Sequence, residues 1–268
     1  GLAPYSTRTG AGELRHLVLR LGKRTDELMV VLVTAQSEGV DLEGLAGRLA
    51  AAAPGLRSFY HVANRHVSDA VIFEEMRLVQ GAPAIEEMLA GVAFRITPQA
   101  FFQTNTPAAE LLYRAIGERT GLGADSRVLG LYCGSGAIEL SLARGVRQVT
   151  GVDSLAENIR AAEENRVSNG IGNVSFVAGT VEDFLKEARG ETPDALVIDP
   201  PRPGMTPKAL RGVLTLGVPR VAYVSCNPEA LARDLGGFLA AGYDVEAILP
   251  FDFFRHTSHL EALAILSK

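Results

Sequence analysis

From Thr106 onward, apolar segments of strand length alternate with segments of helical length, and no other feature of the chain constrains its fold so strongly. Alternation of this kind is typical of a parallel sheet covered by helices. Thr106 as N-cap, with Pro107 in the first helical turn, would begin the first helix of the series. The strand-like segments are "RVLGLY" (127–132), "QVTGVD" (148–153), "VSFVAG" (174–179), "ALVIDP" (195–200) and "RVAYVSC" (220–226).

Two more apolar segments, 243–253 and 260–267, close the chain. They are separated by too few residues for a crossover helix, so we predict an antiparallel hairpin. Five parallel strands and a terminal hairpin give a seven-stranded α/β sheet, Rossmann-like in type. This layout resembles that of methyltransferases dependent on S-adenosyl-L-methionine (SAM).

Residues 1–95 have a different pattern, and we expect them to form a smaller α+β domain ahead of a catalytic domain at 96–268. His61 and His66 lie five residues apart in loop-like sequence, and we do not expect a metal site there. The predicted elements are a hairpin of strands 13–22 and 27–35, a helix at 41–53, and strands at 55–64 and 69–81.

The bulk composition excludes several classes of protein. A net charge of −5 argues against a protein that grips nucleic acid by overall charge. Two cysteines form no disulfide framework, which favours reduced thiols and a cytoplasmic location. We find no membrane-spanning stretch. The chain starts at Gly1 in mid-pattern, so we expect a fragment of a longer protein.

The first two parallel strands end in residues suited to a nucleoside ligand. Gly134 and Gly136 permit a tight turn and close approach of the backbone to a ligand, and Asp153 offers a carboxylate to both hydroxyls of a ribose. A nicotinamide dehydrogenase would use similar residues, but Glu139 stands where the third glycine of G-x-G-x-x-G would fall. We therefore favour SAM, with an ordinary strand-to-helix turn as the other alternative.

Two further loops are distinctive. Ser154 and Glu157 have the spacing of a capping box for the next helix, which would end at Asn169-Gly170. The fourth strand ends in Asp199-Pro200-Pro201, a rigid backbone with a carboxylate directed into the cleft. Arg202 follows, where amino-group methylases of nucleic acid carry an aromatic residue.

Cys226 ends the fifth strand, directly before Asn227 as N-cap and Pro228 in the first helical turn. A free cysteine is often a small buried hydrophobe. Here it lies at the ligand-binding edge of the sheet, and a helix N-terminus should lower the pKa of its thiol. We therefore predict a nucleophile.

A thiolate serves a methyltransferase whose target carbon is not itself nucleophilic, such as carbon 5 of uracil. Attack of sulfur on carbon 6 creates an enolate, and after methyl transfer a base must remove the proton on carbon 5. Glu261 opens the last apolar strand, where burial would raise the pKa of its carboxyl toward a useful range. Its alternative role is a solvated edge residue.

These residues together resemble the RNA 5-methyluridine methyltransferases, which act on ribosomal and transfer RNA. The matching motifs are "FFQTN", "LYCGSG", "GVD", "DPPRPG", "VSCNPEALARD" and "HTSHLE". The resemblance implies Cys226 as nucleophile and Glu261 as base. It also implies that Gln103, Tyr132, Gly134, Gly136, Asp153, Thr180 and Asp199 contact SAM, and that Phe101, Arg202 and His259 lie near the target base.

The chain departs from the family pattern in several places. Ala137 stands where many members have Asn, and Thr180 replaces a carboxylate or amide. The N-terminal RNA-binding β-barrel and the four cysteines of an iron–sulfur site are missing from this sequence. The motifs favour ribosomal over transfer RNA as substrate. Two other readings remain open: a SAM methyltransferase with a different acceptor, and an RNA-binding module without activity.

Overall fold

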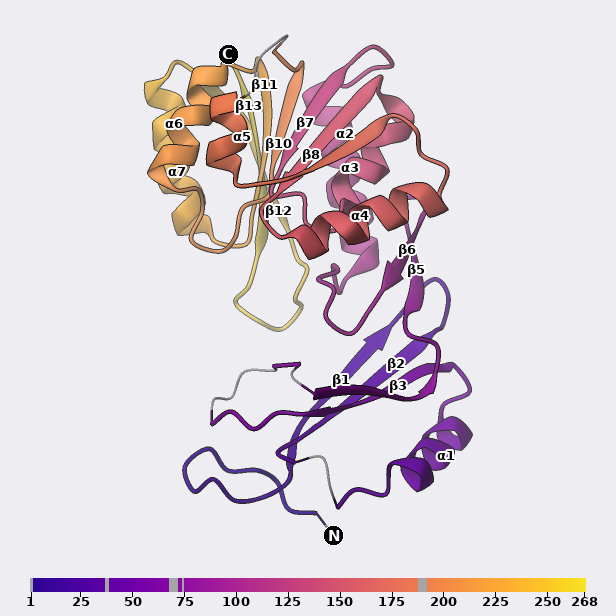
Figure 1. Cartoon of the computed structure of the whole chain (residues 1–268). Coiled ribbons are helices and arrows are strands. Elements are labelled where there is room, and N and C mark those ends of the chain that lie inside the picture. Colours follow the sequence, from indigo (N-terminus) through magenta and orange to yellow (C-terminus); the bar gives the residue numbers. More distant parts are fainter. Residues whose placement is uncertain (1, 37–38, 68–71, 74, 188–191) are drawn as a thin grey trace. The chain divides into compact units, whose positions relative to one another are not determined.

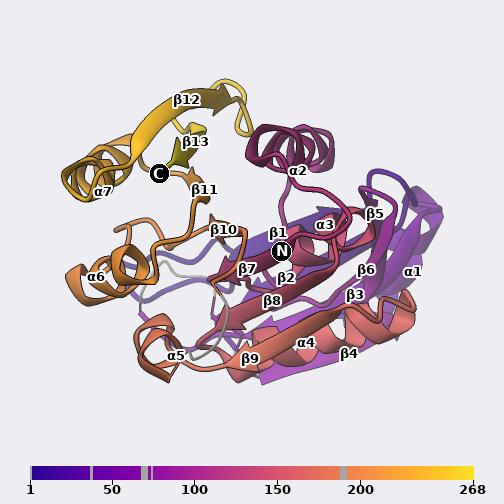
Figure 2. The ribbon, with the colours of Figure 1, turned by 90° about the horizontal axis from the view of Figure 1, so that it is seen from above.

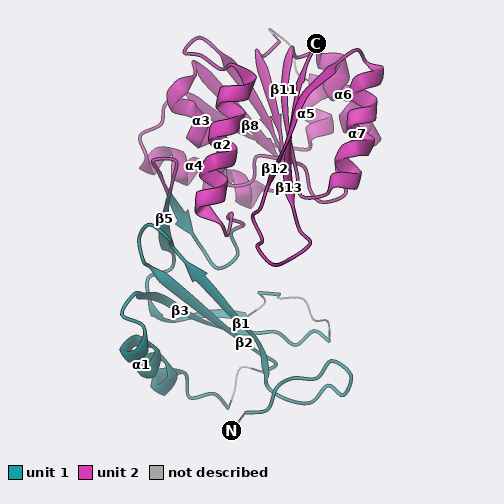
Figure 3. Ribbon diagram, turned by 180° about the vertical axis from the view of Figure 1, so that it is seen from behind, with its two compact units in different colours: residues 1–88, 94–100 teal, residues 89–93, 101–268 magenta. Residues whose placement is uncertain are grey.

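The computed structural model describes residues 2–36, 39–67, 72–73, 75–187 and 192–268. It consists of two compact units, coloured separately in Figure 3. Unit 1 comprises residues 1–88 and 94–100, and unit 2 comprises residues 89–93 and 101–268.

Unit 1 contains a four-stranded sheet in the order β1-β2-β3-β4. The pair β1–β2 is antiparallel, β2–β3 is parallel and β3–β4 is antiparallel. Helix α1 makes the crossover that a parallel pair requires, and its apolar side packs on Val30, Leu32 and Phe59. The bounds are β1 Leu14–Leu21, β2 Leu28–Thr34, α1 Leu42–Ala52, β3 Leu56–Ala63 and β4 Glu75–Gly81.

These elements confirm the predicted hairpin, helix and strand at 55–64. Of the strand predicted at 69–81, residues 75–81 form β4, and residues 69–71 and 74 lie outside the described part of the chain. The sequence pattern missed a short hairpin of β5 (Ile85–Leu89) and β6 (Val92–Ile96). Its turn has positive φ at both Ala90 and Gly91, a conformation signalled more clearly by Asn-Gly than by Ala-Gly.

Unit 2 is built on a seven-stranded sheet in the order β12-β13-β11-β10-β7-β8-β9. Strands β7 to β11 are mutually parallel, and β13 pairs antiparallel with both β11 and β12. The predicted α/β layout, with five parallel strands and a terminal hairpin, is confirmed. The strands are β7 Arg127–Leu131, β8 Gln148–Asp153, β9 Val174–Ala178, β10 Ala195–Ile198, β11 Arg220–Ser225, β12 Asp244–Phe251 and β13 Glu261–Ser267.

Helices cover both faces of this sheet (Figures 1 and 2). One face carries α2, α3 and α4, and the other carries α5, α6 and α7. Because the helix after β7 and the helix after β10 lie on opposite faces, the edge between these two strands is a topological switch point, where α/β proteins bind ligands. The helices are α2 Thr106–Thr120, α3 Ala137–Leu142, with the 3-10 turn Ala143–Gly145, α4 Ala156–Ser168, α5 Val181–Glu187, α6 Pro207–Leu216 and α7 Pro228–Ala240.

Two predicted helix starts are wrong in detail. The N-cap of α2 is Asn105, whose side chain accepts the Ala108 N–H, so Thr106 is already helical. The N-cap of α4 is Leu155 and has no side-chain cap, so Ser154 forms no capping box. The Asp153 carboxylate accepts the Leu155 N–H instead. By contrast, α4 ends at Asn169-Gly170 as expected, with Gly170 at a φ of 63°.

No helix in the described ranges is long and apolar enough to cross a membrane. The same ranges contain no cluster of three or more His, Cys, Asp and Glu side chains suited to a metal ion. His61 is buried in unit 1, where its Nε2 lies 2.8 Å from Thr34 Oγ1. Burial, and then the charge of Arg77, lowers its pKa. Its position is that of a packed core histidine.

Candidate active site

A cavity of about 350 Å³ opens at the carboxyl edge of the seven-stranded sheet, wholly within unit 2. Its walls come from the ends of β7, β8, β10 and β11, from the segment before α2, and from the start of β13. Eight of the residues predicted to form the site line this cavity: Phe101, Gln103, Tyr132, Gly134, Asp153, Asp199, Cys226 and Glu261.

Strand register explains why residues far apart in sequence meet here. In the antiparallel pair β11–β13, Ser225 lies opposite Ala262. Cys226 follows Ser225 along the chain and Glu261 precedes Ala262, so the two residues adjoin this last pair at the cavity. In the parallel pair β10–β7, Ile198 lies beside Leu131. Asp199 and Tyr132 are the next residues along the chain, so they lie at the ends of adjacent strands. The sheet therefore brings the predicted nucleophile and base to neighbouring positions.

The glycine turn after β7 has two different uses. Gly134 has a φ of 54°, and a Cβ placed on it would have no neighbour within 4 Å, so the backbone is open to a ligand there. Gly136 has a φ of 79°, and its Cβ would lie 2.5 Å from Phe176 Cζ. It does not line the cavity, so it serves the packing of the turn.

Asp153 is fixed by the protein at the end of β8. It is 8% exposed and accepts the Gly134 N–H at 2.9 Å, the Leu155 N–H at 2.9 Å and the Asn158 side-chain amide at 3.1 Å. A carboxylate offers about four lone-pair positions, so acceptor capacity remains on the side that lines the cavity. Asn158 also lines the cavity and was missed by the sequence pattern, because an Asn inside a helix gives no signal of its own.

Thr180 lies outside the cavity lining. It is exposed, its hydroxyl donates to Asp183 Oδ2 at 2.8 Å, and it accepts the Asp183 N–H at 3.1 Å. These bonds cap the start of α5. The contact of Thr180 with a cofactor stays a prediction. Ala137 lines the cavity beside the glycine turn.

Two carboxyl groups at the cavity have raised pKa values. Burial raises the pKa of Glu261 to about 7. Burial, followed by the charge of Glu261, raises the pKa of Asp199 to about 7. The expectation for Glu261 is therefore confirmed, and both groups are close to the pKa that suits a general base at neutral pH.

The expectation for the Cys226 thiol is wrong. Its pKa is raised, first by burial and then by the negative charge of Glu261, although Arg202 opposes this effect. Asn227 Oδ1 accepts the N–H groups of Glu229 and Ala230, so the side chain of Asn227 uses the helix N-terminus. Burial, with the charge of Glu261, outweighs the influences that lower the pKa of the thiol.

Cys133 also lines the cavity, at the end of β7. Burial, then the charges of Glu139 and Asp153, raises the pKa of its thiol far above the usual range. A thiol of this kind is unreactive. The pKa of the Cys226 thiol is raised as well, but there the charge of Arg202 acts against the rise.

The residues predicted to meet a substrate lie at or beyond the mouth of the cavity. Phe101 lines it and is 69% exposed, an unusual state for an aromatic side chain. Arg202 is exposed, and its carbonyl oxygen accepts from the Asn227 amide at 3.1 Å. His259 is exposed in the β12–β13 loop, with its ring centroid 6.2 Å from that of Phe254. Arg202 and His259 are not part of the cavity lining.

Two buried polar residues behind the cavity escaped the sequence analysis. Tyr113 of α2 lines the cavity, and burial, then the charges of Asp199, Glu139 and Glu261, raises its pKa. Glu139 is 2% exposed, its Oε2 has no hydrogen-bond partner among the described residues, and burial raises its pKa to about 8. A Cβ at Gly130 would lie 2.0 Å from Glu139 Oε1, so that glycine makes room for the carboxyl.

Comparison with known proteins agrees with this geometry. The family profile described as "tRNA (Uracil-5-)-methyltransferase" matches residues 74–268. An "uncharacterized RNA methyltransferase" of Caldanaerobacter subterraneus is 37% identical over 98% of this chain and 59% of its own length. Another from Gloeobacter violaceus is 37% identical over 100% of this chain and 58% of its own. The chain thus spans under two thirds of these relatives.

Among solved structures, the tRNA (uracil-54, C5)-methyltransferase of Pyrococcus abyssi, in complex with S-adenosyl-L-homocysteine, superposes with a TM-score of 0.79. It is 31% identical over 98% of this chain and 62% of its own. The family match covers most of the chain, including every residue of the cavity, and the fold agrees. The chain therefore belongs to the tRNA (uracil-5-)-methyltransferase family.

Proposed function

We propose that the chain transfers a methyl group from SAM to carbon 5 of a uridine in RNA, with Cys226 as nucleophile and Glu261 as base. The observation that supports the proposal is that Cys226 and Glu261 line one cavity, and that their neighbours Ser225 and Ala262 are paired across β11 and β13. A nucleophile and a base on rigid neighbouring strands can act on adjacent atoms of one ring.

The cavity fits SAM on several grounds. The Gly134 backbone is open to close approach, the Asp153 carboxylate is held at the cavity wall, and Tyr132 and Gln103 complete that side. SAM would supply an electrophilic methyl group. The relative from Pyrococcus abyssi was solved with the demethylated product, which supports the assignment.

The proposed reaction follows from the two side chains. The Cys226 thiolate forms a bond to carbon 6, and the electron pair of the 5,6 double bond moves to carbon 5. Carbon 5 then takes the methyl group, and the donor leaves as S-adenosyl-L-homocysteine. Glu261 removes the proton from carbon 5, the double bond re-forms, and the sulfur leaves carbon 6 with its electron pair.

The RNA substrate is ribosomal or transfer RNA. The sequence motifs favour ribosomal RNA, whereas the relative from Pyrococcus abyssi is named for uracil 54 of tRNA. Unit 1, which covers most of residues 1–95, would contribute RNA contacts, and the exposed Phe101 at the cavity and the exposed Arg202 would contact a flipped base. Relatives are longer, so additional segments in them would add to RNA affinity.

Incubation with labelled SAM and unmodified ribosomal or transfer RNA tests the proposal. We expect 5-methyluridine in one of the two pools, detected by nucleoside mass spectrometry. A methyl group on any other atom would instead show a methyltransferase with a different acceptor. RNA binding without transfer, in protein that binds SAM, would show an RNA-binding module.

A further inference from the structure

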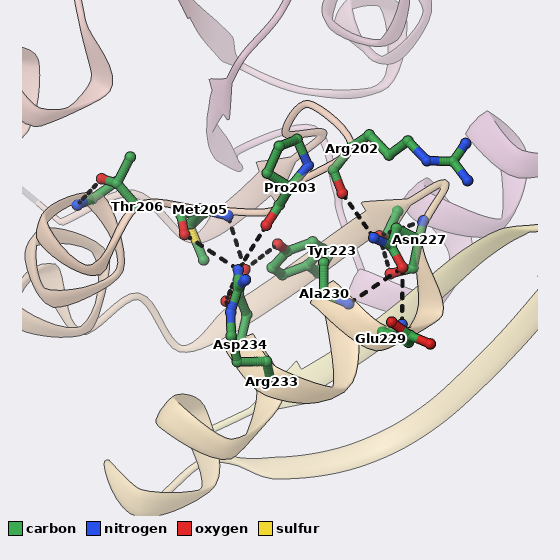
Figure 4. A network of polar contacts seen from close by, with 12 residues as sticks. Arg202, Pro203, Met205, Thr206, Tyr223, Asn227, Glu229, Ala230, Arg233 and Asp234 are labelled. Atoms are coloured by element: carbon green, nitrogen blue, oxygen red, sulfur yellow. Dashed lines mark hydrogen bonds and ion pairs between the residues drawn. The ribbon is translucent and has the colours of Figure 1, made fainter.

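The loop between β10 and α6 is tied to helix α7 by a buried polar network (Figure 4). Asp234, on the second turn of α7, is 1% exposed and accepts from three residues. Tyr223 Oη donates to it at 2.6 Å, the Met205 N–H at 2.9 Å and Arg233 Nη2 at 2.7 Å. A buried carboxylate with donors on both oxygens is a fixed point in a structure.

The network contacts four consecutive residues of the loop. The carbonyl oxygen of Arg202 accepts from the Asn227 amide at 3.1 Å, and that of Pro203 accepts from Arg233 Nη2 at 2.9 Å. Gly204 has a φ of 80°, and a Cβ on it would lie 2.5 Å from Arg233 Nη2. Met205 donates its N–H to Asp234. All of the partners lie on α7 or at its N-cap.

The position of the β10–α6 loop matters because predicted residues of the site adjoin it. Cys226 immediately precedes the N-cap of α7, and Arg202 is the first loop residue in the network. Asp199, nearer the cofactor side, is held separately by its own N–H, which donates to the Leu131 carbonyl at 3.2 Å. The network therefore fixes residues 202–205, which directly follow the loop residues Pro200 and Pro201 that line the cavity together with Cys226.

We propose that Asp234 and Arg233 are positioning residues for the first step of the reaction, because they fix Pro203 and Met205 and so restrain the preceding Arg202, which is bound to Asn227, the residue after Cys226. The inference rests on the proposed function. The contacts join the β10–α6 loop to helix α7, which follows β11. Cys226 and Arg202 would therefore move together. Arg202 also lowers the pKa of the thiol, against the effect of burial and carboxylates, and would lose this influence if the loop moved.

Gly204→Ala is the main test, because its Cβ would lie 2.5 Å from Arg233 Nη2 and 2.7 Å from Asp234 Oδ2, so that the loop and the network cannot keep their present contact. Gly242→Ala is the matched control: Gly242 has a similar φ of 85°, but its Cβ would meet nothing within 4 Å. Tyr223→Phe is the second variant, because it removes one hydrogen bond to Asp234 while Arg233 and Met205 still donate. All are made in the full chain with Cys133→Ser.

Three quantities are measured: the rate of covalent complex formation with 5-fluorouridine RNA, the pH profile of Cys226 alkylation by iodoacetamide, and SAM affinity. We expect Gly204→Ala to slow complex formation about a hundredfold and Tyr223→Phe about tenfold, since a displacement of about 1 Å can cost a hundredfold. The alkylation profile should move to higher pH, with SAM affinity within about threefold of the control.

Complex formation in both variants at the rate of Gly242→Ala would overturn the proposal, as would an unchanged alkylation profile in Tyr223→Phe. If Gly204→Ala does not fold, Tyr223→Phe decides the matter alone. A parent chain that forms no covalent complex would contradict the proposed function instead. The alkylation profile needs no RNA, so it still tests whether the network positions Arg202.

Discussion

Replacing Glu261 by glutamine should stabilise the protein at alkaline pH while it blocks the reaction. Glu261 is 7% exposed, and its pKa is about 7 in the folded chain against an ordinary value of 4.5. Between these two values the folded state keeps a proton that the unfolded state has released. Stability therefore falls as pH rises from about 4.5 to 7, and the loss is complete above pH 7.

The size of this effect follows from the two pKa values. At about 1.4 kcal/mol for each pH unit, the interval from 4.5 to about 7 corresponds to about 3 kcal/mol. Glutamine does not ionise and has nearly the same shape. We therefore expect Glu261→Gln to unfold with about 3 kcal/mol more free energy than the parent at pH 8, and with nearly equal free energy at pH 4.5.

Urea unfolding of both chains at pH 4.5 and pH 8 measures the difference. Glu246→Gln serves as control, because Glu246 is exposed and its pKa is lowered by hydrogen bonds from Ser267 and Arg220. At pH 8 the free energy of unfolding of Glu246→Gln should be slightly lower than that of the parent. If the difference in the free energy of unfolding between Glu261→Gln and the parent is the same at pH 4.5 and at pH 8, the argument from burial is refuted.

The same variant tests the proposed role of the carboxyl group in the reaction. Cys226 attack and methyl transfer precede proton removal, so Glu261→Gln should accumulate a methylated covalent complex with ordinary uridine RNA on a denaturing gel. Loss of a general base slows such a step by about a hundred- to ten-thousandfold. Normal turnover would exclude Glu261 as the base, and His259 would be the next candidate.

Three further outcomes are expected. Cys226→Ala should abolish methylation and the complex with 5-fluorouridine RNA, whereas Cys133→Ser should keep both; an active Cys226→Ala chain would remove the covalent mechanism. Asp153→Ala should weaken SAM about ten- to a hundredfold in calorimetric titration, because a hydrogen bond to a charged acceptor is worth about 1.5–3 kcal/mol, and equal affinity would place the ribose elsewhere. Asp199→Asn should move the alkylation profile of Cys226 to lower pH, since the Asp199 charge raises the thiol pKa, and an unmoved profile would contradict that.

Sequence periodicity predicted the catalytic unit well, because each parallel strand is a short apolar run that ends in a polar residue or glycine. Residues such as Asp153, Asp199 and Cys226 come together since the carboxyl ends of parallel strands share one edge. Contacts between residues that are far apart in the chain could not be predicted from the sequence. Nothing local shows that Asp234 meets Met205, 29 residues earlier.

The errors have the same origin. The pKa of Cys226 was expected from its own helix, but burial raises it, and so do the charges of Glu261 at the start of β13 and Asp199 after β10. Ser154 was expected to cap α4, yet the Asp153 carboxylate at the end of β8 accepts the Leu155 N–H. In each case a contact from another element, or from the next turn of chain, outweighed the local expectation.

The pairing of β13 has a consequence for how the family can diversify. β13 lies between β11 and β12 and is held on both sides, so its register is fixed by the ladder and not by the loop before it. Insertions or deletions at 252–260 would leave the pairing of Ser225 with Ala262, and with it the placement of Cys226 and Glu261 at the cavity, unchanged. The length and composition of that loop, which carries His259, can therefore vary without moving these two residues.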